Sequence, residues 1–274
     1  RRAYAGRGAA IVVIPNDLAA EEIPADGYYS AAATHATPVL PAGSDEQVDA
    51  ALRLIGAAQR PVMYVGQGVR GAADTVMTLA RKLQMPVITT ALGKPIIPYE
   101  FESLLGSAAR VASKPANEAL RVADLIMFVG SNYPFAEVMF SPNAKFIQVE
   151  ADSKTLGKRH HTDVAILADA PATLKKMIDR SDDAPRSGWY QANVDNVKNW
   201  HQYNDDMMTR TTGKMRFEPV FGQINRIATD DAIFAIDVGD VTQNAVRLLK
   251  VNGRQAWTTS GLFATMGAGL PAAL

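Results

Sequence analysis

Short apolar runs alternate with amphipathic segments along most of this chain. Residues 61–65, PVMYV, form a nearly all-apolar run with β-branched residues, which predicts a strand buried on both faces. Over residues 72–84 the apolar side chains recur every three or four positions, which predicts a helix. A second apolar run, residues 86–91, follows. The pattern therefore predicts a strand–helix–strand unit with a glycine turn, GQGVRG, at residues 66–71. This turn is expected to open the helix, where a pyrophosphate could lie against free backbone N–H groups.

The same alternation continues on both sides of this unit. Ser44 and Gln47 are spaced as a capping box at the start of a helix. Strands alternating with helices imply a doubly wound parallel sheet, so we expect a Rossmann-like α/β fold. Further strands are predicted within 124–138, 145–152 and 164–169, and further helices over 45–60, 114–123 and 170–180.

The remaining segments suggest several parts. Residues 9–15, AAIVVIP, are expected to be a buried strand of an upstream domain, and proline-rich residues 92–110 are expected to be irregular. From Phe217 onward, helices and strands alternate again and predict a second, partial α/β domain. The expected divisions are an upstream tail (1–24), a linker (25–43), a central domain (44–182), a linker helix (183–216) and a truncated further domain (217–274).

Composition excludes several classes of function. The chain has 274 residues, and its 28 Lys and Arg balance 28 Asp and Glu, which argues against a nucleic-acid or acidic-membrane surface. There is no cysteine, which excludes disulfides and fits an intracellular, cytoplasmic protein. No apolar run approaches the roughly 18 residues of a membrane span. The four histidines lack metal-binding spacing, so no metal site is expected within the chain. Both ends look cut, which suggests part of a longer protein.

Small, hydroxyl and acidic residues follow the predicted strands. The carboxyl edge of a parallel sheet is its ligand side, so these residues are expected to converge there. Turn chemistry and helix capping are the alternative reading of each one. A nicotinamide cofactor is disfavoured because no acid follows the second strand until Glu100. The residues are Gly66, Gln67, Gly68, Thr89, Thr90, Gly130, Ser131, Asn132, Glu150, Asp152 and Asp169.

Six phrases resemble the thiamine diphosphate-dependent oxidases and decarboxylases, and within that family the flavin-containing, phosphate-dependent pyruvate oxidases. The last phrase is shared widely in the family, whereas KPANEAL and GSNYPFAEV are narrower. The phrases are YVGQGVRGA (64–72), LGSAARVASKPANEAL (105–120), FVGSNYPFAEV (128–138), LGKRHHTDVAILADA (156–170), AIDVGDVTQNAVR (235–247) and TTSGLFATMGAGLPAA (258–273).

The resemblance implies a function for the longer protein. It implies oxidative decarboxylation of pyruvate, with phosphate and O2 as further substrates, to acetyl phosphate, CO2 and H2O2. The cofactors would be FAD, thiamine diphosphate and Mg2+, and the assembly a homodimer or homotetramer. By this resemblance residues 1–24 end a pyrimidine-binding domain, residues 44–182 bind FAD, and residues 217–274 begin a diphosphate-binding domain.

The resemblance also assigns site residues. Val238 and Gly239 would line the gap between flavin and thiamine, and Met266 would hold the thiamine in its bent shape. The positions implied for FAD are Gly66, Gln67, Gly68, Thr90, Ala91, Ser107, Arg110, Asn132, Tyr133, Pro134, Phe135, Glu150, Asp152, Asp169 and Ala170.

Two parts of the family pattern are missing from the chain. The activating glutamate belongs to the first domain, and the Gly-Asp-Gly magnesium motif would lie beyond Leu274. The chain alone is therefore expected to be inactive, although its central domain could keep FAD. Acetolactate synthase, a quinone-linked pyruvate dehydrogenase and a non-catalytic nucleotide-binding module remain open as alternatives.

Overall fold

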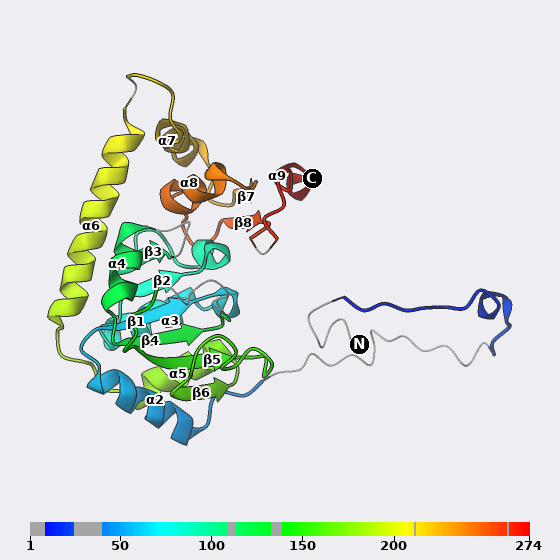
Figure 1. The fold of residues 1–274 in the computed structure, drawn as a ribbon, viewed down its shortest axis with the longest axis horizontal. Coiled ribbons are helices and arrows are strands. Elements are labelled where there is room, and N and C mark those ends of the chain that lie inside the picture. Colours follow the sequence, from blue (N-terminus) through cyan, green and yellow to red (C-terminus); the bar gives the residue numbers. More distant parts are fainter. Residues whose placement is uncertain (1–8, 25–39, 109–112, 133–138, 211, 262) are drawn as a thin grey trace. The chain divides into compact units, whose positions relative to one another are not determined.

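A computed structural model describes residues 9–24, 40–108, 113–132, 139–210, 212–261 and 263–274. The chain divides into two compact units, residues 1–40 and 41–274 (Figure 1). In the first unit a short 3-10 helix, η1 (Leu18–Ala20), is the element found among the described residues. The strand predicted at residues 9–15 is wrong, because this segment is exposed and pairs with no described strand. A strand needs a hydrogen-bonding neighbour, and an apolar run alone does not supply one.

The second unit contains a six-stranded parallel sheet in the order β3-β2-β1-β4-β5-β6. This confirms the predicted doubly wound α/β fold, since strand order reverses direction at β1 and β4. The strands are β1 (Pro61–Val65), β2 (Val87–Thr89), β3 (Leu104–Ser107), β4 (Leu125–Val129), β5 (Lys145–Glu150) and β6 (Val164–Leu167).

Helices cover both faces of this sheet. The cores on the two faces draw on alternate residues of the same strands: in β1, Met63 and Val65 enter one core and Val62 and Tyr64 the other. The first core includes residues of α2, α3 and α5, and the second includes residues of α4 and α6. The helices are α2 (Asp45–Ala57), α3 (Ala73–Lys82), α4 (Lys114–Val122), α5 (Ala170–Arg180) and α6 (Gly188–Met208).

The irregular segment expected at residues 92–110 is partly wrong. It contains the 3-10 helix η4 (Ala91–Ile96) and the edge strand β3. β3 has four residues, pairs only with β2, and includes Gly106 in the left-handed region at φ 90°. A short edge strand with a glycine in it lacks the long apolar run that marks the central strands.

The C-terminal part forms a small second sheet. β7 (Ile233–Ile236) and β8 (Ala256–Thr259) pair in parallel, as the second run of strand and helix patterns predicted. Phe221, Ile236, Ala245 and Trp257 lie in the core beneath it. The long helix α6 runs past the six-stranded sheet up to α7 (yellow in Figure 1). The helices here are α7 (Phe217–Ile227), α8 (Asp240–Leu248) and α9 (Gly269–Ala273).

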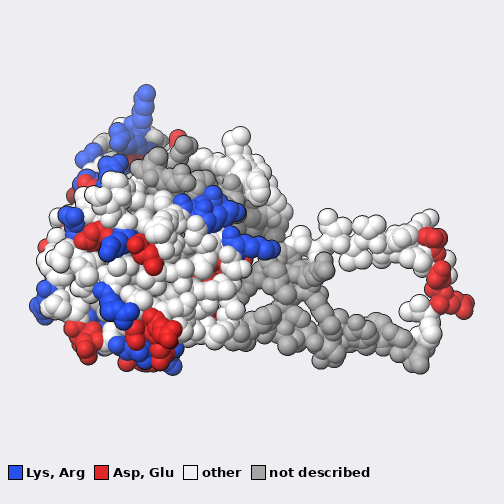
Figure 2. Space-filling view, turned by 60° about the horizontal axis from the view of Figure 1, so that its bottom comes forward, with Lys and Arg blue, Asp and Glu red and all other residues white. Residues whose placement is uncertain are grey.

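Charge is mixed over the surface. On the face shown in Figure 2, basic and acidic side chains are interspersed. Between α2 and α5, for example, Arg180 pairs with both Asp45 and Asp49. This pattern matches the even balance of acids and bases in the sequence.

The capping box predicted from Ser44 and Gln47 is confirmed. The Ser44 hydroxyl accepts from the Gln47 backbone N–H at 3.2 Å, and the Gln47 side chain accepts from the Ser44 N–H at 3.1 Å. Ser44→Ala is expected to lower the free energy of unfolding by about 1 kcal/mol, because one N–H at the start of α2 loses its partner. Urea denaturation measures this change, and an unchanged midpoint would contradict the role of the cap.

Candidate cofactor site

The strand order creates one distinctive position at the carboxyl edge of the large sheet. β1 and β4 are neighbours, and the chain leaves them toward opposite halves of the sheet, β2 and β3 on one side and β5 and β6 on the other. In doubly wound sheets the crevice at such a switch point is where nucleotides bind. The turns after β1 and β4 therefore define the candidate site.

Three glycines bring these two turns into direct contact. The Gly66 N–H donates to the Val129 carbonyl, and the Gly68 N–H donates to the Gly130 carbonyl, both at 3.0 Å. A Cβ on Gly68 would lie 2.5 Å from the Gly130 Cα, and one on Gly66 would lie 2.5 Å from the Gly130 oxygen. Only glycine allows two backbones to approach this closely.

The structure corrects one detail of the predicted phosphate turn. The glycine turn does not open α3 directly, because the 3-10 helix η3 (Gln67–Val69) comes between. The N–H groups of Gly66, Gly68 and Arg70 already donate to protein carbonyls. The sequence pattern predicted free N–H groups at these glycines, but it could not reveal that the last carbonyl of β4 and the first carbonyl after it would accept from them.

Other predicted cofactor residues also lie along this edge. Thr90 caps η4, accepting from the Gly93 N–H at 3.0 Å, and Ala91 is the first residue of η4. Ser107 ends β3, and its hydroxyl lies 3.0 Å from that of Thr89 at the end of β2. These hydroxyl groups hold the turns in place, which is the turn-chemistry alternative for Thr90.

The acidic residues predicted at the edge lie at the end of β5 and just after β5 and β6. Glu150 Oε1 accepts from the Ala151 N–H at 2.8 Å, and Asp152 Oδ1 accepts from the Lys154 N–H at 2.9 Å. Asp169 caps α5, which begins at Ala170, by accepting from the Ala172 N–H at 2.9 Å. Within the described residues, the second oxygen of each carboxylate makes no hydrogen bond, so each could accept one from a ligand hydroxyl.

The remaining predicted flavin positions fall in or beside segments that the structure leaves out. Asn132 follows β4 and is exposed. Arg110, Tyr133, Pro134 and Phe135 lie outside the described residues.

The residues predicted to face thiamine come together at the second sheet. Val238 and Gly239 follow β7, and Met266 lies in the turn between β8 and α9. The Gly267 N–H donates to Asp237 Oδ1 at 2.8 Å and joins the two turns. Asp237 carries no distinguishing signal in the sequence, since an acid after a strand is common and its partner lies 30 residues away.

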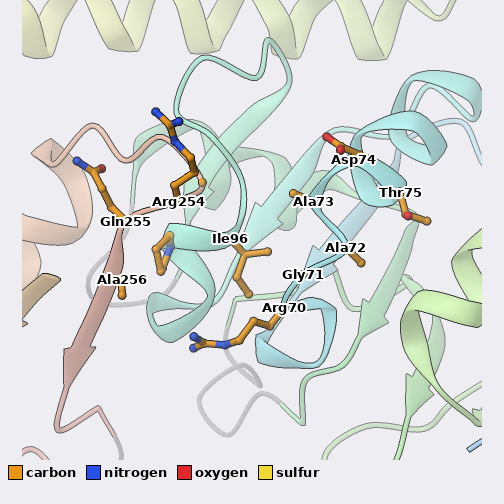
Figure 3. Close-up of a pocket in the computed structure, with 12 residues that line it drawn as sticks. Arg70, Gly71, Ala72, Ala73, Asp74, Thr75, Ile96, Arg254, Gln255 and Ala256 are labelled. Carbon is orange, nitrogen blue, oxygen red and sulfur yellow. The ribbon is translucent and has the colours of Figure 1, made fainter. Parts of the chain in front are cut away.

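A cavity of about 510 Å³ lies elsewhere, between the N-terminal end of α3, η4 and residues 253–256 (Figure 3). Arg70 and Arg254 flank it, and Ile96 lies between them. None of the predicted cofactor residues lines it. The candidate site therefore rests on the strand order and the turns, not on this cavity.

Ionisable side chains from η4, from the segment after it and from α6 influence one another. Burial lowers the pKa of Lys94 to about 8 and that of His201 to about 4, and it raises the pKa of Tyr99. The Tyr99 and His201 rings stack at 3.9 Å, and the Lys250 ammonium lies 5.2 Å from the Tyr99 ring. Sequence reasoning considered His201 only for metal spacing and therefore missed this cluster.

Two classes of site were also sought in the described part of the chain. It contains no group of three or more histidine and acidic side chains placed to hold a metal ion. Its helices include none with the length and apolar character needed to cross a membrane.

Residues 48–177 match the family model described as "Thiamine pyrophosphate enzyme, central domain". Residues 48–177 are therefore similar to the central domain of thiamine pyrophosphate enzymes. The matched span begins in α2 and ends in α5, so this central domain contains the whole six-stranded sheet. The candidate site at β1 and β4 therefore lies within the central domain.

The chain is also similar to longer curated proteins. The chain is 44% identical to pyruvate oxidase of Lactiplantibacillus plantarum, covering 100% of the chain and 46% of that protein. It is 27% identical to the putative thiamine pyrophosphate-containing protein YdaP of Bacillus subtilis, covering 100% and 47%. It is 32% identical to the acetolactate synthase isozyme 1 large subunit of Escherichia coli, covering 85% and 42%. The chain thus spans about half the length of the curated relatives it matches.

Proposed function

We propose that the chain is part of a thiamine diphosphate- and FAD-dependent pyruvate oxidase. The protein would convert pyruvate, phosphate and O2 to acetyl phosphate, CO2 and H2O2. One observation carries this proposal: identity to a pyruvate oxidase is 44% over the whole chain, whereas identity to the acetolactate synthases is 26–32%. The narrow KPANEAL and GSNYPFAEV phrases favour the same assignment.

The central domain would hold FAD across the switch point. The contact between Gly68 and Gly130 supports this, because neither glycine places a side chain between the two turns. Glu150, Asp152 and Asp169 would accept hydrogen bonds from ribose hydroxyls or adenine amines through their free oxygens. Arg110 would offer its charge to the pyrophosphate.

The second sheet would carry the thiamine contacts. Met266, which is 81% exposed, and the half-buried Val238 stand open to a ligand. When bound, thiamine diphosphate would supply the carbanion chemistry of decarboxylation and FAD would take up the electrons. Val238, Gly239 and Met266 would orient the thiamine, while the magnesium ligands and the activating glutamate would come from outside this chain.

The organisation follows the same proposal. The chain would consist of the tail of the pyrimidine-binding domain (1–24), a linker (25–43), the FAD-binding domain (44–182), a linker helix (183–216) and the start of the diphosphate-binding domain (217–274). The protein would be a cytoplasmic homodimer or homotetramer that binds neither nucleic acid nor membranes. This chain alone would not turn over pyruvate.

An acetolactate synthase is the second candidate, favoured by identities of 29–32% over 83–99% of the chain. A quinone-linked dehydrogenase would share the same plan. Assays of the natural-length protein separate them: we expect peroxide and acetyl phosphate from pyruvate. Acetolactate, or reduction of a quinone without peroxide, would reject the proposed reaction.

FAD binding by this chain is expected to depend on Glu150. Glu150→Gln should weaken FAD binding by about tenfold or more, because a charge-assisted hydrogen bond is worth roughly 1.5–3 kcal/mol. The Gln oxygen can still accept from the Ala151 N–H, so the turn should persist. Quenching of flavin fluorescence measures the affinity.

The matched control is Glu118→Gln on α4, where the carboxylate pairs with Lys114 at 2.8 Å and accepts from the Asn196 amide of α6 at 3.2 Å. This variant should bind FAD as the wild type does. Equal loss in both variants, or no binding by the wild type at high micromolar FAD, would count against an FAD site at this edge.

A further inference from the structure

The two turns of the second sheet open on the same side. β7 and β8 are parallel, with Ile236 paired to Thr259 at their carboxyl ends. Asp237 is the first residue after β7, and the chain after β8 returns toward it at Gly267. Strand geometry therefore brings the two turns near each other but does not by itself fix their spacing.

The Asp237 carboxylate fixes that spacing. Its Oδ1 accepts from the Val238 N–H at 2.7 Å and from the Gly267 N–H at 2.8 Å. Backbone N–H groups of Val238, Gly267, Gly269 and Ala268 together hold the pKa of this carboxyl below its usual value. The Asp237 carbonyl in turn accepts from the Thr242 hydroxyl at 2.6 Å, which ties the first turn to α8.

Glycines make this approach possible. A Cβ on Gly269 would lie 2.9 Å from the Asp237 nitrogen and 3.0 Å from its Cβ, so a side chain there would push the turns apart. Gly267 has φ 83° and Gly239 has φ 131°, both in the left-handed region that favours glycine. The backbone of both turns is therefore shaped around one carboxylate.

We propose that Asp237 is a positioning residue that sets the distance between Met266 and the Val238–Gly239 turn. The inference rests on the proposed function, in which these residues contact thiamine diphosphate. The Asp237 carboxylate accepts hydrogen bonds from backbone N–H groups of the two turns, so it acts through these turns and not on the cofactor. Without the Asp237 carboxylate, the Gly267 N–H loses its hydrogen-bond acceptor. The neighbouring, exposed Met266 is then no longer held at a fixed distance from the Val238–Gly239 turn.

The test compares Asp237→Ala and Asp237→Asn with the wild type in the protein at its natural length. For Asp237→Ala we expect amide hydrogen exchange at Val238 and Gly267 to become about tenfold faster or more, and the half-saturating concentration of thiamine diphosphate to rise about tenfold. Asp237→Asn keeps an oxygen acceptor, so both readouts should fall between the wild type and Asp237→Ala. Should Asp237→Ala fail to fold, Asp237→Asn carries the comparison.

The control is Asp240→Asn, which removes the same charge three residues further on. Asp240 is exposed, and the hydrogen bond it accepts from Asn244 uses its backbone carbonyl, so both readouts should stay at wild-type values. Faster exchange with unchanged thiamine diphosphate dependence in Asp237→Ala would overturn the positioning role while leaving the proposed function intact. A wild type that does not respond to thiamine diphosphate at all would overturn both.

Discussion

Gly68→Ala is expected to destabilise the chain by about 2–3 kcal/mol, or roughly 5–10 °C in Tm. The added Cβ would lie 2.5 Å from the Cα of Gly130 and 3.1 Å from its carbonyl oxygen. Both neighbours are backbone atoms, so no side chain can rotate away, and the hydrogen bond from Gly68 to Gly130 must lengthen. Because this contact lies at the proposed flavin site, FAD affinity should fall with stability. Thermal unfolding with and without FAD measures both effects.

Gly56→Ala provides the matched control for this substitution. Gly56 lies exposed in the last turn of α2, with nothing within 4 Å of an added Cβ. Alanine is favoured over glycine in helices by about 1 kcal/mol, so this variant should be as stable as the wild type or slightly more stable. If Gly68→Ala and Gly56→Ala unfold at the same temperature, the close contact between the two turns is not present in solution.

Lys94→Met is expected to raise the free energy of unfolding by about 1–3 kcal/mol near pH 7. The Lys94 side chain is buried, and burial is the cause that lowers the pKa of its ammonium group. Removing a charge from water without a partner is costly, and methionine keeps the length of the chain without the charge. Chemical denaturation of the two proteins measures the difference.

The pH dependence of this effect has a defined sign. Burial lowers the pKa of Lys94 from 10.5 to about 8, so the folded protein binds fewer protons than the unfolded chain between these values. The destabilisation by Lys94 is complete below pH 8 and fades as pH rises toward 10.5. The advantage of Lys94→Met should therefore shrink between pH 8 and 10.5. Lys198→Met, at an exposed position of α6, should change stability by less than about 0.5 kcal/mol at any pH.

Local patterns in the sequence predicted most of the large sheet. β1 and β4 are continuous apolar runs because both of their faces are covered, and this signal is contained in five residues. β3 escaped prediction because it is a short edge strand containing Gly106. Residues 9–15 show the opposite case. Their apolar run predicts a strand, but the segment has no strand partner among the described residues.

The candidate site was predicted less completely than the fold. The convergence of strand ends follows from parallel topology, so Glu150 and Asp169 could be placed at one edge from their positions after strands. The contact of Gly68 with Gly130 and that of Asp237 with Gly267 join residues far apart in the chain, and nothing local encodes them. The resemblance to a known family suggested roles for residues but not these two contacts.

The alternating orientation of β1 limits how this chain can change its length. Adding or deleting one residue inside β1 would exchange the surroundings of Met63 and Tyr64 and send every later side chain of the strand to the opposite face. It would also shift the glycine turn along the sheet, so that Gly68 would no longer lie opposite Gly130. Related proteins should therefore vary in length outside this strand and its turn, and keep the spacing between Pro61 and Gly68 unchanged.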